Sequence, residues 1–189
     1  MNTEAAAVRK FKLVDSRIIA KEVPPSVWIW SEEIATKGIE GTKLFYKMSS
    51  DGLVVHEAAK NMMRDSKFVV TPPQIIKAAC CEVGDLDFPK HKNSVPVPEF
   101  FVRLREIKGI FQQVDAGPSL LYRFGNRPVG EWAIVAMEPI SMSFTNSGIF
   151  LLRCNNDGKR NKKIVSIDGC AVGDGGSIAK KLKLIIAVQ

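Results

Sequence analysis

Hydrophobic residues in the C-terminal half of the chain follow the patterns expected for β-strands. Ile140, Met142 and Phe144 alternate with polar residues, which predicts a strand with one buried face. The residues from Trp132 to Met137 are hydrophobic in succession, which predicts a central strand buried on both faces. Turn residues separate these two strands from three more, predicted over 149–154, 164–172 and 182–188. The C-terminal half therefore predicts a mostly antiparallel meander.

Helical spacing is clearest in the middle of the chain, over residues 98–114. Hydrophobic residues recur there at intervals of 4, 3, 4 and 3, which places them on one face of a helix. These residues are Phe100, Leu104, Ile107, Phe111 and Val114. The segment therefore predicts an amphipathic helix.

Two shorter helices are predicted before it, over 53–64 and 74–83. The second follows Thr71-Pro72-Pro73, a typical helix start, and precedes Gly84, a typical helix end. Further short strands are predicted over 11–23, 27–30, 43–48 and 119–124.

These elements predict an α+β fold, in which a helical middle segment packs on a mostly antiparallel β-sheet formed largely by the C-terminal half. The 189 residues suit a single domain, 1–189. Residues 1–7 are expected to form a frayed terminus. Residues 84–97 contain Pro89 and Pro96 and are expected to form a mobile loop or hinge.

The charge of the chain points to a polyanionic partner. The net charge is +7 and the isoelectric point is about 9.3. From Arg153 to the end, eight lysines and arginines face three aspartates, so this fifth of the chain contributes +5. A concentrated charge creates a local field that attracts nucleic acid or an acidic membrane surface. A basic protein with no such partner is the alternative.

The four cysteines favour a reducing compartment. Cys80 and Cys81 are adjacent, and adjacent cysteines rarely pair, so free thiols are expected. No apolar run approaches the ~20 residues of a membrane-spanning helix, and no secretory signal is expected at the N-terminus. The predicted location is the cytoplasm, with the nucleus or the inner face of a membrane as alternatives, and not the exterior.

Enzymatic and metal chemistry have weak support in the sequence. A cysteine nucleophile would need a base, and the only histidines are His56 and His91. No nucleophile signature surrounds Cys80 or Cys81, so buried thiols on the helix over 74–83 are the favoured interpretation. Zinc ligands at paired spacing are missing, so neither a metal nor another cofactor is predicted.

A glycine-rich turn, Gly173-Asp174-Gly175-Gly176, precedes a pair of lysines near the end of the chain. A phosphate-binding P-loop needs a different spacing and a helix after it, whereas a strand is predicted here. A hairpin turn is the favoured interpretation. Backbone amides of the turn beside the lysines remain an alternative contact for a phosphate.

Two basic segments are the candidate polyanion-binding residues: Lys159, Arg160, Lys162 and Lys163 in a predicted turn, and Lys180, Lys181 and Lys183 around the last strand. The first run is either a solvated tip or a phosphate contact, and both segments form one patch if their strands are neighbours. Arg123 and Arg127 are candidate RNA contacts beside Tyr122 and Phe124. The aromatics Trp28 and Trp30 serve either the core or base stacking.

The function predicted from these features is non-enzymatic: a basic structural protein that self-associates and contacts RNA or an anionic membrane through its C-terminal region. In general character it is similar to viral matrix and coat proteins, although no residue string identifies either family. The alternative is an RNA-binding regulatory module, such as a silencing suppressor. A cysteine-dependent enzyme is the third hypothesis.

Overall fold

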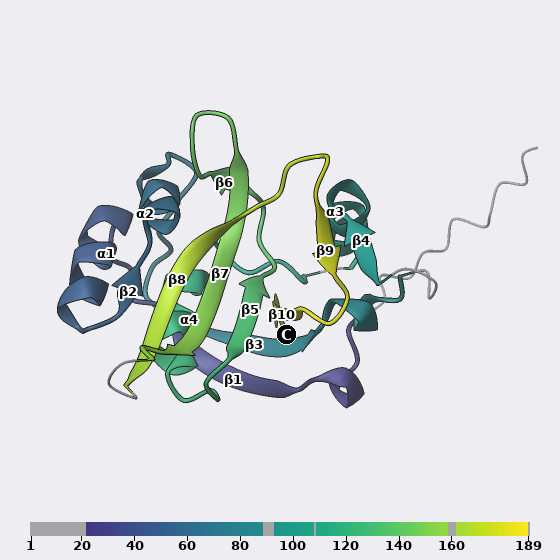
Figure 1. Ribbon diagram of the computed structural model, residues 1–189, viewed down its shortest axis with the longest axis horizontal. Coiled ribbons are helices and arrows are strands. Elements are labelled where there is room, and N and C mark those ends of the chain that lie inside the picture. Colours follow the sequence, from purple (N-terminus) through teal and green to yellow (C-terminus); the bar gives the residue numbers. More distant parts are fainter. Residues whose placement is uncertain (1–21, 89–92, 108, 159–161, 189) are drawn as a thin grey trace, which may run out of the picture.

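A mixed, mostly antiparallel sheet forms the centre of the molecule (Figure 1). The computed structural model describes residues 22–88, 93–107, 109–158 and 162–188. In these residues the sheet has eight strands, seven of them in one continuous order: β1 (Trp30–Ala35), β3 (Ile75–Glu82), β10 (Lys183–Ala187), β5 (Glu131–Val135), β7 (Ser147–Asn156), β8 (Lys163–Ala171) and β2 (Val54–Val55). The short β6 (Ile140–Ser141) also pairs with β7. Neighbours are antiparallel except β10 with β5 and β2 with β8.

Four helices surround this sheet in the described part of the chain: α1 (Gly41–Ser50), α2 (Glu57–Arg64), α3 (Val97–Glu106) and α4 (Ala116–Phe124). α4 packs against β7 and β8, and α2 lies against β8 (Figure 1). α3 lies at the other side of the molecule, beside a separate two-stranded sheet of β4 (Ser94–Pro96) and β9 (Ser177–Ala179). Short 3-10 turns occupy Pro25–Val27 and Val83–Leu86. None of the described helices is long and apolar enough to cross a bilayer.

The core is continuous between the sheet and its helices. Ala133, Ile134 and Val135 of β5 are fully buried, as expected for the middle strand of the sheet. α4 approaches β7 so closely that a Cβ on Gly117 would lie 2.6 Å from the Phe150 ring. Such contact between helix and sheet requires glycine at this position.

The α+β class is confirmed, and so are the strands β5, β7, β8 and β10. The position of the helical segment is not confirmed, because the helices alternate with β2, β3 and β4. The sheet also takes β1, β2 and β3 from the N-terminal half. The predicted strand over 11–23 and the predicted frayed terminus lie almost wholly outside the described residues.

The predicted helix over 74–83 is wrong, because this segment forms β3. Ala78, Ala79, Cys80 and Cys81 are all fully buried, and β3 lies between β1 and β10. These small side chains suit a strand that is covered closely on both faces. Tertiary packing therefore outweighed the helix-start and helix-end signals around the segment.

Two predicted strands are wrong for the opposite reason. Residues 43–48 belong to α1, which buries Leu44, Phe45 and Met48 on one face. Residues 119–124 belong to α4, where Leu120 and Leu121 are buried. A short apolar run fits a buried helix as well as a strand, and only the surrounding structure distinguishes them.

Two predicted helices are partly correct. The segment 53–64 starts with β2, which pairs with β8, and becomes helical only at Glu57. The segment 98–114 is helical up to Glu106 and then turns, with Gly109 at φ 71°. A positive φ is readily accessible to glycine, so the chain leaves the helix there while Ile110 still reaches the core.

A predicted strand and a predicted hairpin turn also differ from the structure. Only Ile140 and Ser141 of the predicted half-buried strand pair with β7, and Phe144 is fully exposed on the loop that follows. The turn Gly173–Gly176 is not a hairpin turn, because β9 after it pairs with β4 and not with β8. The described parts of the predicted hinge over 84–97 contain a 3-10 turn and β4, and residues 89–92 lie outside the described part.

Candidate polyanion-binding surface

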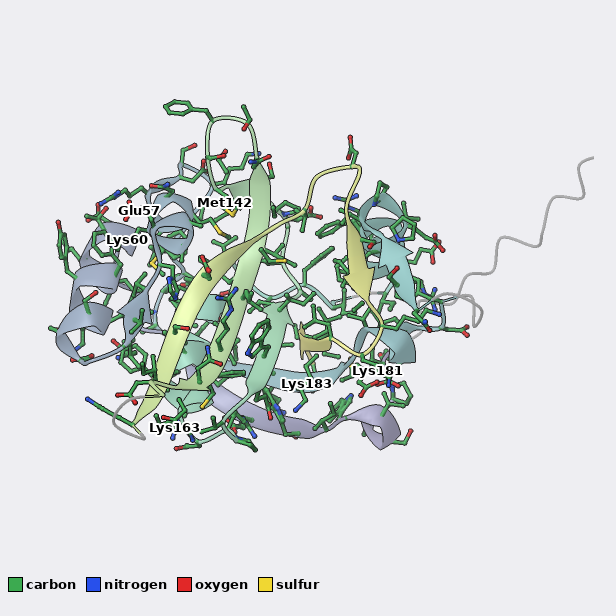
Figure 2. All side chains as sticks on the ribbon, in the orientation of Figure 1. Glu57, Lys60, Met142, Lys163, Lys181 and Lys183 are labelled. Carbon is green, nitrogen blue, oxygen red and sulfur yellow. The ribbon has the colours of Figure 1, made fainter. Side chains whose placement is uncertain are left out.

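Three strands of the sheet begin at the same end of the molecule. β5, β8 and β10 run in the same direction, because β10 is parallel to β5 and β7 is antiparallel to both β5 and β8. α4 ends at the same place, where a Cβ on Gly125 would lie 3.5 Å from Cγ2 of Val165. Figure 2 shows Lys163, Lys181 and Lys183 along this end. The C-terminal turn of α4 therefore meets the first residues of β8 there.

Four exposed cations gather at this end, and we call them the basic end: Arg123, Lys162, Lys163 and Lys181. Their side chains form no ion pair within 4.0 Å among the described residues, and the backbone N–H of Lys162 donates a hydrogen bond to Asp157 at 3.3 Å. Most other described cations are ion-paired, for example Arg105 with Glu138. The side-chain charges of the basic end thus have no ion-pair partner in the part of the chain that the structure describes.

The two basic segments named from the sequence are not neighbours in the sheet. β5 and β7 lie between β10 and β8. With strands about 4.8 Å apart, this places β8 and β10 roughly 14 Å from each other. Both segments still face the same end, so a ligand longer than one phosphate is needed to contact both.

Lys183 is partly buried and ion-paired. Its ammonium lies 2.7 Å from the Glu131 carboxylate, and the side chain of Lys183 is 28% exposed. Lys180 donates a hydrogen bond to the carbonyl of Phe88, at 3.4 Å. Of the lysines before β10, Lys181 is therefore the exposed one without a carboxylate partner in the described structure. Lys159 and Arg160 lie outside the described residues.

Arg127 is also held by its neighbours. Its guanidinium forms an ion pair with Glu32 and lies over the Trp30 ring, 3.9 Å from the centroid. The Arg127 side chain is 15% exposed. Arg123, one turn earlier, is exposed. The structure therefore separates the two predicted RNA contacts: one is packed within the fold and one faces solvent.

The aromatic residues considered for base stacking pack within the molecule. Trp28 donates a hydrogen bond to the carbonyl of Val23, and Phe124 is buried. The hydroxyl of Tyr122 donates to Asp51 at 2.8 Å, and the Lys37 ammonium lies 3.5 Å from the centroid of its ring. Together with the burial of this phenol, the Asp51 carboxylate raises the Tyr122 pKa.

An aromatic residue that the sequence did not indicate as a site lies on the surface near the basic end. Trp132, the second residue of β5, is 48% exposed. Its indole N–H donates to the side-chain oxygen of Asn155 on β7, at 3.2 Å. The guanidinium of Arg153 lies 5.0 Å from the centroid of its ring and forms an ion pair with Asp168, at 3.4 Å.

A surface depression of about 440 Å³ borders this tryptophan. Its walls are the turn 128–130, the start of β5 and the residues 181–183. Trp132 and Lys181 therefore line the same hollow. The sequence could not indicate this pair, because β5 and β10 are about fifty residues apart and their parallel pairing is a property of the fold.

The cysteines and histidines form no metal cluster in the described residues. Cys80 and Cys81 are fully buried in β3, and burial raises the pKa of each thiol to about 12. A thiol with such a pKa is protonated at neutral pH and is a poor nucleophile. His56 precedes α2 and is exposed. His91 lies outside the described residues.

No protein-family model, curated protein or solved structure matches the chain at a significant level.

Proposed function

We propose that this protein is a non-enzymatic assembly protein whose basic end binds the backbone phosphates of RNA. The observation that carries the proposal is that four exposed cations lie at one end of the sheet and that their side chains form no ion pair among the described residues. They come from α4, from the start of β8 and from the turn before β10, which are far apart in the sequence. Because these cations lie at one end of the sheet, we expect a local positive field there.

Phosphate binding suits these side chains physically. Lysine and arginine bind backbone phosphates by charge-assisted hydrogen bonds, with affinity that depends on salt and little on base sequence. Lys162 and Lys163 stand at the start of β8, and both are exposed to solvent. Arg123 adds a guanidinium from the neighbouring helix, and its planar group suits bidentate phosphate contacts.

Self-association is the second part of the proposal. β1 pairs only with β3 among the described residues, so it lies at an edge of the sheet, where another chain is able to pair. Ile75 on β3 is 70% exposed beside the end of β1, opposite Ala35. An exposed edge and an exposed apolar side chain at one place support contact with a second copy.

A binding titration with three proteins tests the proposal. The wild type is compared with a basic-end variant, in which Arg123, Lys162, Lys163 and Lys181 are replaced by Ala. In a control variant, Ala replaces the exposed Lys67 and Lys77, which lie away from this end. We expect the basic-end variant to bind labelled RNA more than about ten-fold more weakly, and the control to bind like the wild type.

Two further measurements distinguish this function from its alternatives. Sedimentation of the wild type over a range of concentrations should show growing assemblies, whereas a fixed monomer or dimer with tight RNA binding would favour a regulatory module. In a titration with vesicles of anionic lipid, the basic-end substitutions should weaken binding less than they weaken binding to RNA. Binding to vesicles and not to RNA would contradict the RNA proposal.

A further inference from the structure

We propose that Trp132 and the depression beside it bind a base of single-stranded RNA. This inference rests on the proposed function, and it adds the kind of RNA that the protein selects. The Trp132 ring is exposed and is held in place on the sheet by a hydrogen bond. Trp132 is 48% exposed, although a tryptophan side chain usually buries most of its surface. The ring thus presents a large apolar surface to solvent at the basic end.

The neighbours of Trp132 hold its ring in one orientation. Asn155 accepts a hydrogen bond from the indole N–H at 3.2 Å. Arg153 is opposite Trp132 in the β5–β7 pairing, and its guanidinium lies 5.0 Å from the ring centroid. Asp168 holds Arg153 in turn, at 3.4 Å. A ring that is fixed in this way loses little entropy when a base stacks on it, which favours binding.

The hollow beside the ring lies on the side of β10. Lys181 lines it, is exposed, and has no carboxylate within 4.0 Å among the described residues. A base in contact with Trp132 would therefore have a cation close by for its phosphate. The combination of an aromatic platform and a cationic groove is the usual arrangement for binding single strands without sequence preference.

The chemistry of the hollow favours a single strand over a duplex. Bases in a duplex stack on each other and present their faces to no protein side chain, whereas an unpaired strand leaves them free. The register places Asn155 on the same face of the sheet as Trp132, so the two residues adjoin there, whereas Lys163 lies on the opposite face.

Fluorescence polarisation with the full chain tests this inference. The probes are a labelled RNA of about 12 nucleotides, within the range of single-strand site sizes, and the duplex of the same length. Trp132→Ala is compared with Trp132→Phe, which keeps an aromatic ring. The matched control is Phe144→Ala, which removes an exposed ring from the β6–β7 loop at the other end of the sheet (Figure 1).

We expect Trp132→Ala to bind the single strand about 5-fold to 150-fold more weakly, the effect of losing one stacked base. Trp132→Phe should lose less, and Phe144→Ala should bind like the wild type. The salt dependence should remain that of the wild type in Trp132→Ala, because stacking releases no counterions. RNA should also quench part of the tryptophan fluorescence in the wild type and less of it in Trp132→Phe. Circular dichroism melts should show that all three variants fold.

Four results would overturn the inference. If the wild type binds RNA with steep salt dependence and Trp132→Ala binds equally well, the stacking site is wrong and the proposed function stands. If the wild type binds no RNA at low salt, both are wrong. Equal affinity for the duplex and the single strand would also contradict stacking. So would a Trp132→Ala variant that loses affinity for anionic vesicles and keeps its affinity for RNA.

Discussion

The ammonium of Lys183 lies 2.7 Å from the carboxylate of Glu131, and the Glu131 side chain is only 6% exposed. Lys183 begins β10 and Glu131 begins β5, so this ion pair joins two parallel strands at the end of the sheet. The other carboxylate oxygen, Oε1, is buried and has no hydrogen-bond donor among the described residues. Lys183 is therefore the cation that lies against this buried carboxylate.

We expect Lys183→Met to reduce stability far more than it reduces RNA binding. Removing one partner of a buried ion pair leaves the other charge unpaired, which costs about 3–5 kcal/mol. Urea unfolding measures this loss, and Lys181→Met is the matched control because Lys181 is exposed. Lys183→Met combined with Glu131→Leu should recover most of the stability. If Lys183→Met unfolds at the same urea concentration as the wild type, the pair does not stabilise the fold.

Arg123 and Arg127 should respond in opposite ways to replacement by Ala. Arg127→Ala removes the contact with Trp30 and leaves Glu32 without its partner, so we expect a lower melting temperature and little change in RNA affinity. Arg123→Ala should leave the melting temperature unchanged and weaken RNA binding. Thermal melts and polarisation titrations on both variants decide this. A loss of affinity in folded Arg127→Ala that equals the loss in Arg123→Ala would contradict the assignment.

The buried thiols predict a loss of stability in alkaline solution. Burial raises the pKa of Cys80 and Cys81 from 9.0 to about 12. Below pH 9 the thiols are protonated in both states. Above pH 9 the unfolded chain releases these protons first, so the free energy of unfolding falls as the pH rises towards 12, by up to about 1.4 kcal/mol per pH unit for each thiol.

Urea unfolding between pH 8 and pH 11 measures this effect, and the double variant Cys80→Ala/Cys81→Ala is its control. The double variant should lose stability less steeply with pH. It should also bind RNA like the wild type, because both thiols are in the core and away from the surface. An equal slope in the two proteins would assign the alkaline effect to other groups.

Several elements of this fold could be predicted from the sequence because local pattern and final environment agree in them. The run from Trp132 to Met137 reads as a central strand, and β5 is in the middle of the sheet. The segments of β7 and β8 have turn residues between them and form the hairpin that their order suggests. β8 is the next predicted strand along the chain after β7, so the two are the nearest candidates for pairing. The place of β5 in the middle of the sheet is expected because hydrophobic residues lie on both of its faces.

The sequence does not reveal where distant strands meet. A simple meander would place β10 next to β8, and the two basic segments would then lie side by side. Instead the chain crosses through β9, and β10 pairs with β3 and β5. This crossover brings Lys181 to the hollow beside Trp132 and takes Lys183 to Glu131. Both relationships depend on pairing across about fifty residues, which no local pattern encodes.

The salt dependence of RNA binding is the most direct test of the basic end. The affinity of the wild type and of the basic-end variant for a labelled ~12-nucleotide RNA is measured by fluorescence polarisation at several salt concentrations. Each phosphate contact on a single strand contributes about −0.7 to the slope of log affinity against log salt. We expect the variant, which lacks four cations, to have a slope smaller in magnitude by up to about 2.8. An unchanged slope would mean that RNA contacts the protein elsewhere and would contradict the proposed site.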